Sequence, residues 1–410
     1  MSEGGHADRA DQAGDTGTSY GWRIGTVRGT PVYIARSWPL IIVLLLLVVS
    51  PTLRNSGRSL GFAVFVAASS GVLLLASVLV HEAAHAVVAN LRGHQVDRVV
   101  ADVWGGHTVY DSTDVTPGTT ALVAVAGPLA NLALALVTWL AQPLVSNDLM
   151  GNLLGAGAYV NLFVGLFNLL PGLPLDGGQI VSSLVWQITG RKGTGLSAAG
   201  WLGRVVAVVA VLWFIGVPFT RGEQPSLISL VWVAMIAFFL WRGASASIRS
   251  GQIHDATAGP ALSVLEPVVL VAGDMTVAAA VGLMVGAPSF STESNRDPLK
   301  TGSVARGSWV AVSDAGGWPF GLVDPAAAAA VPVASRQTAR LSAVALAQPR
   351  AWVLELPPDA VLTELVRLMS ERSLSVAIVI DAQTRRVAGL ATAQHINDVV
   401  GTELARRGRR

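Results

Sequence analysis

Two histidines and a glutamate capable of metal chemistry lie together at residues 81–85, in the sequence His-Glu-Ala-Ala-His. On a helix, His81 and His85 project from one face about one turn apart, so their imidazoles can bind one zinc ion. Glu82 lies beside them, where it can act as a general base. The surrounding residues 71–89 are almost entirely apolar, and ionisable groups at membrane depth are costly unless they are paired or bind a metal. The pattern therefore predicts a zinc hydrolase site inside a membrane.

A third zinc ligand is predicted at Asp176, which follows the sequence Asn-Leu-Leu-Pro-Gly-Leu-Pro-Leu at 168–175. Pro171 and Pro174 end the preceding apolar helix, and the two glycines after Asp176 permit tight turns. Irregular backbone at membrane depth is tolerated where it lines a cavity. We therefore expect Asp176 on a helix break that faces the histidines. Taken alone, the segment also fits a simple helix-ending turn.

Composition indicates a membrane part joined to a soluble part. Of the 410 residues, 52% are hydrophobic and 13% are charged, which is too apolar for one soluble domain. The absence of cysteine excludes disulfides and thiolate ligands, and a net charge of +2 gives no basis for nucleic acid binding. About six segments are apolar enough to be predicted as transmembrane helices: 38–53, 60–91, 119–144, 152–170, 199–217 and 227–241.

Loop charges predict the orientation of these helices. Arg23, Arg28 and Arg36 precede the first segment, whereas the loop at 145–151 has no lysine or arginine. The excess of positive charge on cytoplasmic loops then places both termini in the cytoplasm of a multi-pass cell-membrane protein. We expect a disordered tail at 1–19, a transmembrane catalytic domain at 20–243 and a cytoplasmic domain at 244–410.

The residues after 244 have the composition of a soluble α/β domain with an internal repeat. A helical run at 274–284 precedes strands at 309–313 and 319–323. A helix at 357–371 precedes strands at 376–380 and 387–390 and a final helix near Gln394. In the membrane part, valines at 96–103 have the spacing of a strand, so we expect a short strand or hairpin at 95–106, with a plain polar loop as the alternative.

Three motifs together resemble the site-2 protease family of intramembrane zinc metalloproteases, which are peptidase M50-like. These are the HEAAH sequence, Gly-Pro-Leu-Ala-Asn at 127–131 and the sequence at 168–178. The resemblance covers residues 21 to about 190. Gly105 and Gly106 match a glycine pair that follows the zinc helix in that family. The layout after 244 is similar to the paired CBS domains of one branch of the family.

The resemblance implies a role for each site residue. His81, His85 and Asp176 would hold one Zn²⁺, and Glu82 would be the catalytic base. Asn168 would bind the substrate or its oxyanion near the metal. In the CBS-like pair, Thr392 would contact an adenine nucleotide, and the pair would form a homodimer.

The implied function is hydrolysis of peptide bonds within or near transmembrane segments of single-span membrane proteins, known as regulated intramembrane proteolysis. The bilayer is then a partner, and a substrate strand would pair with the edge of the strand at 96–103. Two alternatives are a catalytically idle zinc-binding scaffold that senses nucleotide and a zinc transporter. Glu82 separates these readings, because neither a transporter nor an idle scaffold requires a base beside the metal ligands.

Overall fold

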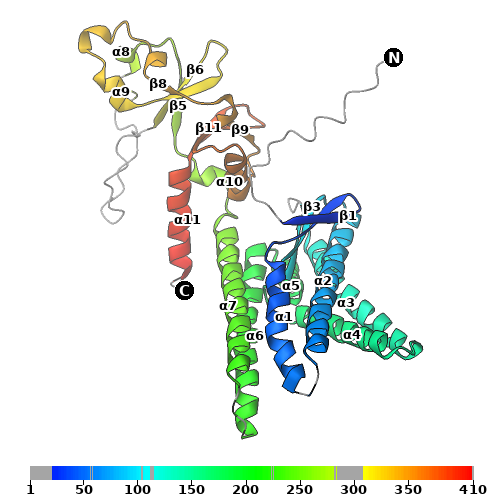
Figure 1. Ribbon diagram of the computed structural model, residues 1–410. Helices are drawn as coiled ribbons and strands as arrows, with labels where there is room; N and C mark the ends of the chain where they lie inside the picture. Colours follow the sequence, from blue (N-terminus) through cyan, green and yellow to red (C-terminus); the bar gives the residue numbers. More distant parts are fainter. Residues whose placement is uncertain are drawn as a thin grey trace, which may run out of the picture. The chain divides into compact units, whose positions relative to one another are not determined.

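The computed structural model describes residues 21–55, 57, 59–102, 105–110, 115–222, 224, 226–280, 283 and 308–408, in two compact units (Figure 1). The first unit is Met1–Gly251 and the second is Gln252–Arg410. The expected tail at 1–19 lies outside the described residues. The expected domain limits at 243 and 244 stay a prediction.

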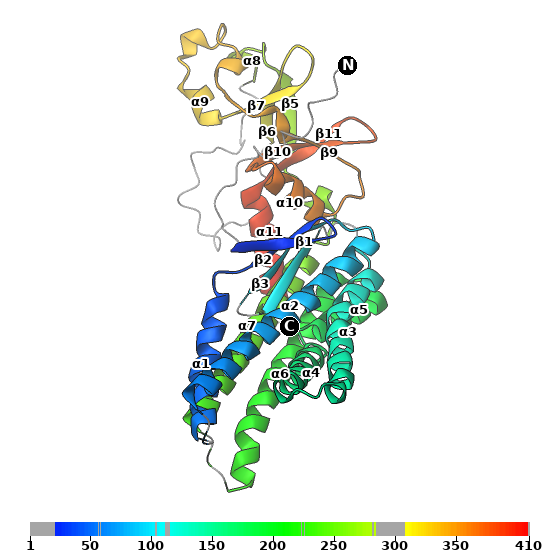
Figure 2. The same cartoon turned by 45° about the vertical axis from the view of Figure 1, so that its right-hand side comes forward.

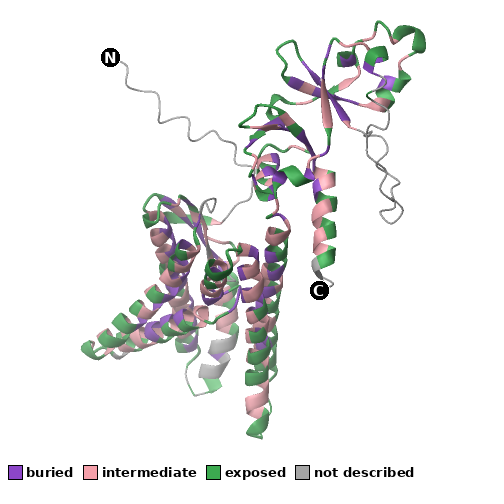
Figure 3. Ribbon diagram, turned by 180° about the vertical axis from the view of Figure 1, so that it is seen from behind, coloured by how far each residue is buried: buried purple, intermediate pink, exposed green. Residues whose placement is uncertain are grey.

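Long apolar helices make up most of the first unit. Five of them are long and apolar enough to cross a membrane, and the predicted first segment forms a shorter apolar helix over Trp38–Leu47. In the most apolar 18-residue stretch of each of these five helices, only 11% to 33% is buried inside the protein (Figure 3). The remaining apolar surface is suited to contact with lipid. A polytopic helical membrane protein is thereby confirmed. The helices are α1 (Trp38–Asn55), α2 (Leu60–Leu91), α3 (Pro117–Ala141), α4 (Asp148–Asn168), α6 (Lys192–Thr220) and α7 (Leu227–Ala256).

One helix of this unit was not predicted from the sequence. Helix α5 (Asp176–Thr189) is amphipathic and too short to span a bilayer, so it gives no hydropathy signal. Its ending is ordinary, with Gly190 in the left-handed conformation at the C-cap. Helices α3 and α4 run side by side as a hairpin joined by the short turn Gln142–Leu144 (Figure 2).

A four-stranded sheet covers the end of α2 that carries the histidines. Its order is β1 (Trp22–Val27), β2 (Thr30–Ile34), β3 (Val96–Asp102) and β4 (Gly105–Tyr110). The expected hairpin at 95–106 is confirmed as β3 and β4. The β1–β2 hairpin was missed, and its turn has positive φ at both Arg28 and Gly29, as a two-residue hairpin requires. Val32 and Val99 of the sheet pack with Ala86 and Ala89 of α2.

The second unit is an α/β domain built from a repeat, as predicted. In each half, two parallel strands precede a third strand that is antiparallel to the second. The first half contains β5 (Val268–Ala272), α8 (Val277–Ala280), β6 (Trp309–Ser313), β7 (Pro319–Val323), α9 (Pro325–Ala330) and β8 (Ala345–Ala347). The second contains β9 (Val353–Leu356), α10 (Leu362–Glu371), β10 (Val376–Asp381), β11 (Val387–Thr392) and α11 (Ala393–Gly408).

The two sheets of this unit share an apolar core. Trp309 and Leu322 of the first sheet pack with Ile378 and Leu390 of the second, and with Trp352 just before β9. The helical run expected at 274–284 is described only as α8, because 281–282 and 284 lie outside the described residues.

Candidate metal centre

Helix α2 presents two histidine rings to the same buried space. His81 and His85 are both buried, and their ring centroids lie 4.6 Å apart with the planes nearly perpendicular. Asp176 approaches from the start of α5: its Oδ2 lies 2.9 Å from Nε2 of His81 and 3.5 Å from Nε2 of His85. One ligand atom from each of the three residues lies within 4.8 Å of the others. The structure thus brings together the three residues predicted as ligands.

Asp176 reaches this space from the first turn of a helix and not from an irregular break, which corrects one expectation. The break lies before it, at the prolines, and Leu175 is the N-cap of α5. Gly177 and Gly178 are needed for close packing, because a Cβ at either would overlap the backbone of the preceding loop. Leu175 packs with Ala207 of α6 and Leu240 of α7. Helices α6 and α7 therefore position the segment that carries Asp176.

The donor set and the space between the donors fit a zinc ion. Two imidazole nitrogens and one carboxylate oxygen form a three-ligand set of the kind found in catalytic zinc sites. Gly127 of α3 leaves room beside them: a Cβ at this position would lie 2.5 Å from Nε2 of His85 and 2.6 Å from Nε2 of His81. A residue larger than glycine would occupy the space onto which the histidine nitrogens converge.

Hydrogen bonds on the far side of each ring fix its orientation. Nδ1 of His81 donates to Oδ1 of Asn131 at 2.6 Å, and Nδ1 of His85 donates to the carbonyl of Val123 at 2.7 Å. With Nδ1 protonated, the Nε2 lone pair of each ring is available to a metal. Helix α3 therefore supplies the outer partners of both histidines.

A buried polar network extends this support to α4. Asn131 donates to the Ser77 hydroxyl at 2.9 Å and to Oδ1 of Asn161 at 2.8 Å, and Ser77 donates to the same oxygen of Asn161 at 2.9 Å. Asn161 in turn donates to the carbonyl of Gly157 at 2.9 Å. Asn131 ends the motif at 127–131 but had no predicted role, and Asn161 was not identified from the sequence. The available signal was an asparagine at the centre of each of two apolar spans.

Glu82 is buried against strand β4. The Thr108 hydroxyl donates to Oε2 of Glu82 at 2.8 Å, and a Cβ at Gly106 would overlap the Glu82 side chain. Gly106 is therefore required where the strand passes over the carboxylate. Thr108 was not identified from the sequence, because nothing in a single strand indicates which helix residue it will face.

The strand at 96–103 does not offer the free edge that we expected. Strand β3 pairs in parallel with β2 and antiparallel with β4, so both of its edges are occupied. The missed β1–β2 hairpin accounts for this error. In the described part of the chain, β1 and β4 are the outer strands of the sheet. The outer strand that lies beside Glu82 is β4.

The hydrogen bonds of the two remaining predicted site residues, Asn168 and Thr392, involve none of the three proposed zinc ligands. Asn168 is the last residue of α4, and its amide donates to the carbonyl of Val164 at 3.1 Å. Thr392 ends β11, where its hydroxyl donates to Oε2 of the buried Glu266 at 2.8 Å and accepts from the backbone N–H of His395 at 3.2 Å. Their predicted contacts with substrate and nucleotide stay predictions.

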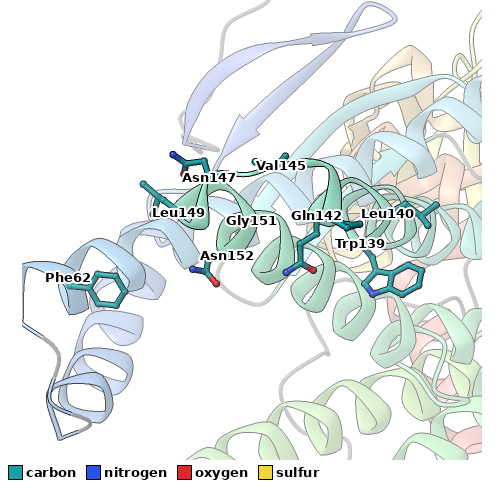
Figure 4. A pocket seen from close by; sticks show the side chains of 10 residues that line it. Phe62, Trp139, Leu140, Gln142, Val145, Asn147, Leu149, Gly151 and Asn152 are labelled. Carbon is teal, nitrogen blue, oxygen red and sulfur yellow. The ribbon is translucent and has the colours of Figure 1, made fainter.

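A pocket of about 920 Å³ lies at the other end of α2, around Phe62 (Figure 4). Phe62 is 19 positions before His81, roughly 28 Å along the helix. The remaining lining comes from the α3–α4 turn and its flanks, including Trp139, Gln142 and Asn147. The described residues that line this pocket are apolar or carry amides, and none of them is ionisable.

Comparison with known proteins agrees with the metal centre. The profile of Peptidase family M50 matches residues 140–213, a region that includes Asp176. The chain is 32% identical over 242 residues to a "Putative zinc metalloprotease" of Synechocystis sp., covering 57% of this chain and 61% of that protein. It is 36% identical over 232 residues to the "Putative zinc metalloprotease Rip3" of Mycobacterium tuberculosis, covering 54% and 57%. The match thus spans about three fifths of the length of each relative.

Solved structures resemble parts of this chain more distantly. A site-2 protease from Methanocaldococcus jannaschii aligns with 55% of this chain and 94% of its own, at 21% identity and a TM-score of 0.41. The CBS domain of a bacterial CNNM/CorC family Mg²⁺ transporter aligns with 43% of this chain and 96% of its own, at 15% identity and a TM-score of 0.26. Residues 140–213 thus match Peptidase family M50, and the relatives that this chain resembles are named as zinc metalloproteases, in agreement with the predicted resemblance to site-2 proteases.

Proposed function

We propose that this protein is a zinc metalloendopeptidase that hydrolyses peptide bonds within or near the transmembrane segments of single-span membrane proteins. The observation that carries the proposal is the convergence of His81, His85 and Asp176 beside the buried Glu82. The curated relatives are named as zinc metalloproteases, which supports the same activity. The apolar faces of the surrounding helices favour a substrate that is itself in the bilayer.

Each residue of the site has a chemical task in this proposal. Zinc held by His81, His85 and Asp176 would supply a Lewis acid and lower the pKa of water. Glu82 would accept a proton from the attacking water and pass it to the leaving amine. The hydrogen bond from Thr108 orients the Glu82 carboxylate for that transfer. Asn168 would donate to the oxyanion, after its amide turns away from the Val164 carbonyl.

Strand β4 would hold the scissile peptide extended. A helical substrate segment hides its amides in its own hydrogen bonds, so it must unwind before hydrolysis. An outer strand can pair with an extended peptide through main-chain hydrogen bonds. Because β4 passes over Glu82 at Gly106 and Thr108, a peptide paired along it would lie beside the proposed base.

Reconstitution with candidate substrates tests the activity. The purified chain and single-span proteins would be incorporated into liposomes, with Glu82→Gln as the matched variant. We expect cleavage by the wild type and a rate lower by about 100-fold or more in the variant, as loss of a general base predicts. Equal cleavage by both proteins would reject Glu82 as the base. Zinc binding without cleavage of any substrate would favour the idle scaffold, and zinc flux through the liposomes would favour a transporter.

We also propose that both termini are cytoplasmic in the cell membrane. Because the chain has no cysteine, single cysteines can report the orientation. Gln95 follows α2 and Asn147 precedes α4, and both are exposed. In intact cells a membrane-impermeant thiol reagent should label a cysteine at 147 and leave one at 95 unlabelled. The opposite pattern would invert the topology.

The second unit would bind an adenine nucleotide and form a homodimer. Its repeated strand–helix–strand–strand layout supports this proposal. Because Thr392 bonds to Glu266, a nucleotide contact from its hydroxyl would require Glu266 to give up that bond. Calorimetry of the full chain with AMP, ADP and ATP, together with its mass in solution, tests both parts. A monomer that gives no heat with any nucleotide would exclude them.

A further inference from the structure

A single arginine, Arg204, lies between two tryptophans on the membrane helices α6 and α7. Its guanidinium carbon is 4.6 Å from the ring centroid of Trp201 and 4.9 Å from that of Trp241. The Nη2 atom donates to the hydroxyl of Ser245 at 3.1 Å, and that hydroxyl donates to the carbonyl of Trp241 at 2.6 Å. Both tryptophans are about half exposed, so this group faces the surroundings of the two helices.

The position of Arg204 is that of a membrane interface. Fifteen apolar or small residues follow it, at 205–219, before Thr220 and Arg221, and the apolar run of α7 at 227–241 ends at Arg242. Both arginines therefore mark the same end of the two spans. Tryptophan and arginine gather at such interfaces, where the rings lie among glycerol groups and the cations reach phosphates.

Arg204 has unused hydrogen-bonding capacity and an uncompensated charge. Its Nε is buried and has no hydrogen-bond partner. Among the residues that the structure describes, no ion pair involves Arg204. A guanidinium carries five N–H donors, and contact with rings and one neutral hydroxyl leaves its charge without an anion. Desolvating a charge without a partner is costly, so an anion from outside the chain would stabilise this arrangement.

We propose that Arg204, Trp201, Trp241 and Ser245 form a binding site for the headgroup phosphate of an anionic phospholipid. The planar guanidinium matches two phosphate oxygens, and the flanking rings supply an apolar contact for the glycerol and the upper acyl chains. A lipid is favoured over a soluble phosphate because the site lies on the exposed face of two apolar spans. This site is separate from the proposed proteolytic centre.

A lipid at this site would act on the segment that carries Asp176. Gly203 of α6 is buried against the loop between α4 and α5, where a Cβ would overlap the carbonyl of Leu173. A lipid that links α6 to α7 beside Gly203 would thus stabilise the packing of that loop. The expected consequence is a higher melting temperature of the whole membrane unit.

Thermal unfolding of the full chain in detergent tests the site. Phosphatidylglycerol, phosphatidylcholine and inorganic phosphate would be titrated separately against wild type, Arg204→Gln and Arg221→Gln. Arg221 is the control, because it is an exposed arginine at the other end of α6. We expect phosphatidylglycerol to raise the melting temperature of wild type and Arg221→Gln. Its apparent affinity for Arg204→Gln should be weaker by at least about tenfold, as expected for loss of a charge-assisted hydrogen bond.

Three outcomes would overturn the proposal: no shift in the wild type, an equal shift in Arg204→Gln, or a full shift with inorganic phosphate alone. A second measurement needs only the wild type, in case Arg204→Gln does not fold. A phosphatidylglycerol with a photoreactive headgroup should crosslink to peptides that contain Trp201–Arg204 or Trp241–Ser245. Crosslinks confined to other peptides would place the lipid elsewhere and contradict the site.

Discussion

At the centre of the membrane unit, Asn131, Asn161 and Ser77 are buried and hydrogen-bonded to one another. The centre of the C-terminal unit consists instead of Trp352, Leu365 and other apolar side chains. In lipid, burying one more leucine gains little, because the surroundings are equally apolar. In the membrane unit, hydrogen bonds and glycines that allow close contact therefore set how the helices pack against one another. The stability of the C-terminal unit depends instead on removing apolar surface from water.

The largest expected effect comes from filling the space at Gly127. Gly127→Ala places a Cβ 2.5 Å from Nε2 of His85, within the space onto which the ligands converge. We expect this variant to lose zinc binding and cleavage. Gly118→Ala is the matched control on the same helix, because nothing lies within 4 Å of its Cβ. Normal zinc content in Gly127→Ala would show that the metal lies elsewhere.

A core truncation in the C-terminal unit should have the next largest effect, and on stability alone. Leu365 is fully buried, so Leu365→Ala should cost about 2–5 kcal/mol of unfolding free energy. Hydrogen exchange of peptides from α10 and β10 in the full chain would measure the loss. Leu346→Ala, at a position about half exposed, should change little. Zinc content should be normal in both variants, and loss of zinc in Leu365→Ala would mean that the two units are energetically coupled.

Removing the outer partner of His81 should weaken the metal site. Asn131→Ala deletes the acceptor of the 2.6 Å hydrogen bond from Nδ1. Loss of such a partner lowers metal affinity by about 10- to 100-fold. Competition with a zinc chelator would measure it, with the exposed Asn152→Ala as the control of the same residue type. Unchanged affinity would mean that Asn131 has only a packing role.

The smallest expected effect concerns an exposed ion pair of the C-terminal unit. A hydrogen bond from Arg367 holds the pKa of Glu364 below its usual range. The stabilisation is present above the unfolded-state pKa of Glu364 and is lost as pH falls through the lowered folded-state value. Because both side chains are more than a third exposed, we expect about 0.5 kcal/mol or less. Glu364→Gln should remove this pH dependence from hydrogen exchange in α10, and a change above 1.5 kcal/mol at neutral pH would contradict it.

Sequence reasoning succeeded where chemistry or periodicity is local. The histidines are four residues apart on one helix, so their convergence follows from helix geometry, and the proline pair indicated where α4 ends. The repeat of the C-terminal unit followed from apolar runs between turns. The helix-ending prolines and the two glycines after Asp176 indicated this residue as the third ligand, and the resemblance to site-2 proteases implied the same role.

Sequence reasoning failed where long-range pairing decides the structure. The edge expected at 96–103 is covered by β2, whose pairing with β3 joins residues 67 positions apart. The contact of Thr108 with Glu82 depends on the same sheet. Helix α5 was missed because it is too short and too amphipathic for a hydropathy signal. Gly177 and Gly178, which were expected to permit tight turns, lie in its first turn and allow close packing against the loop before it.

The zinc content of purified wild type, Asp176→Ala and Glu82→Gln tests the central claim most directly. If His81, His85 and Asp176 hold one metal and Glu82 acts on water, wild type and Glu82→Gln should each contain about one zinc per chain, and Asp176→Ala should contain almost none. Full zinc occupancy in Asp176→Ala would contradict the metal centre described for this protein.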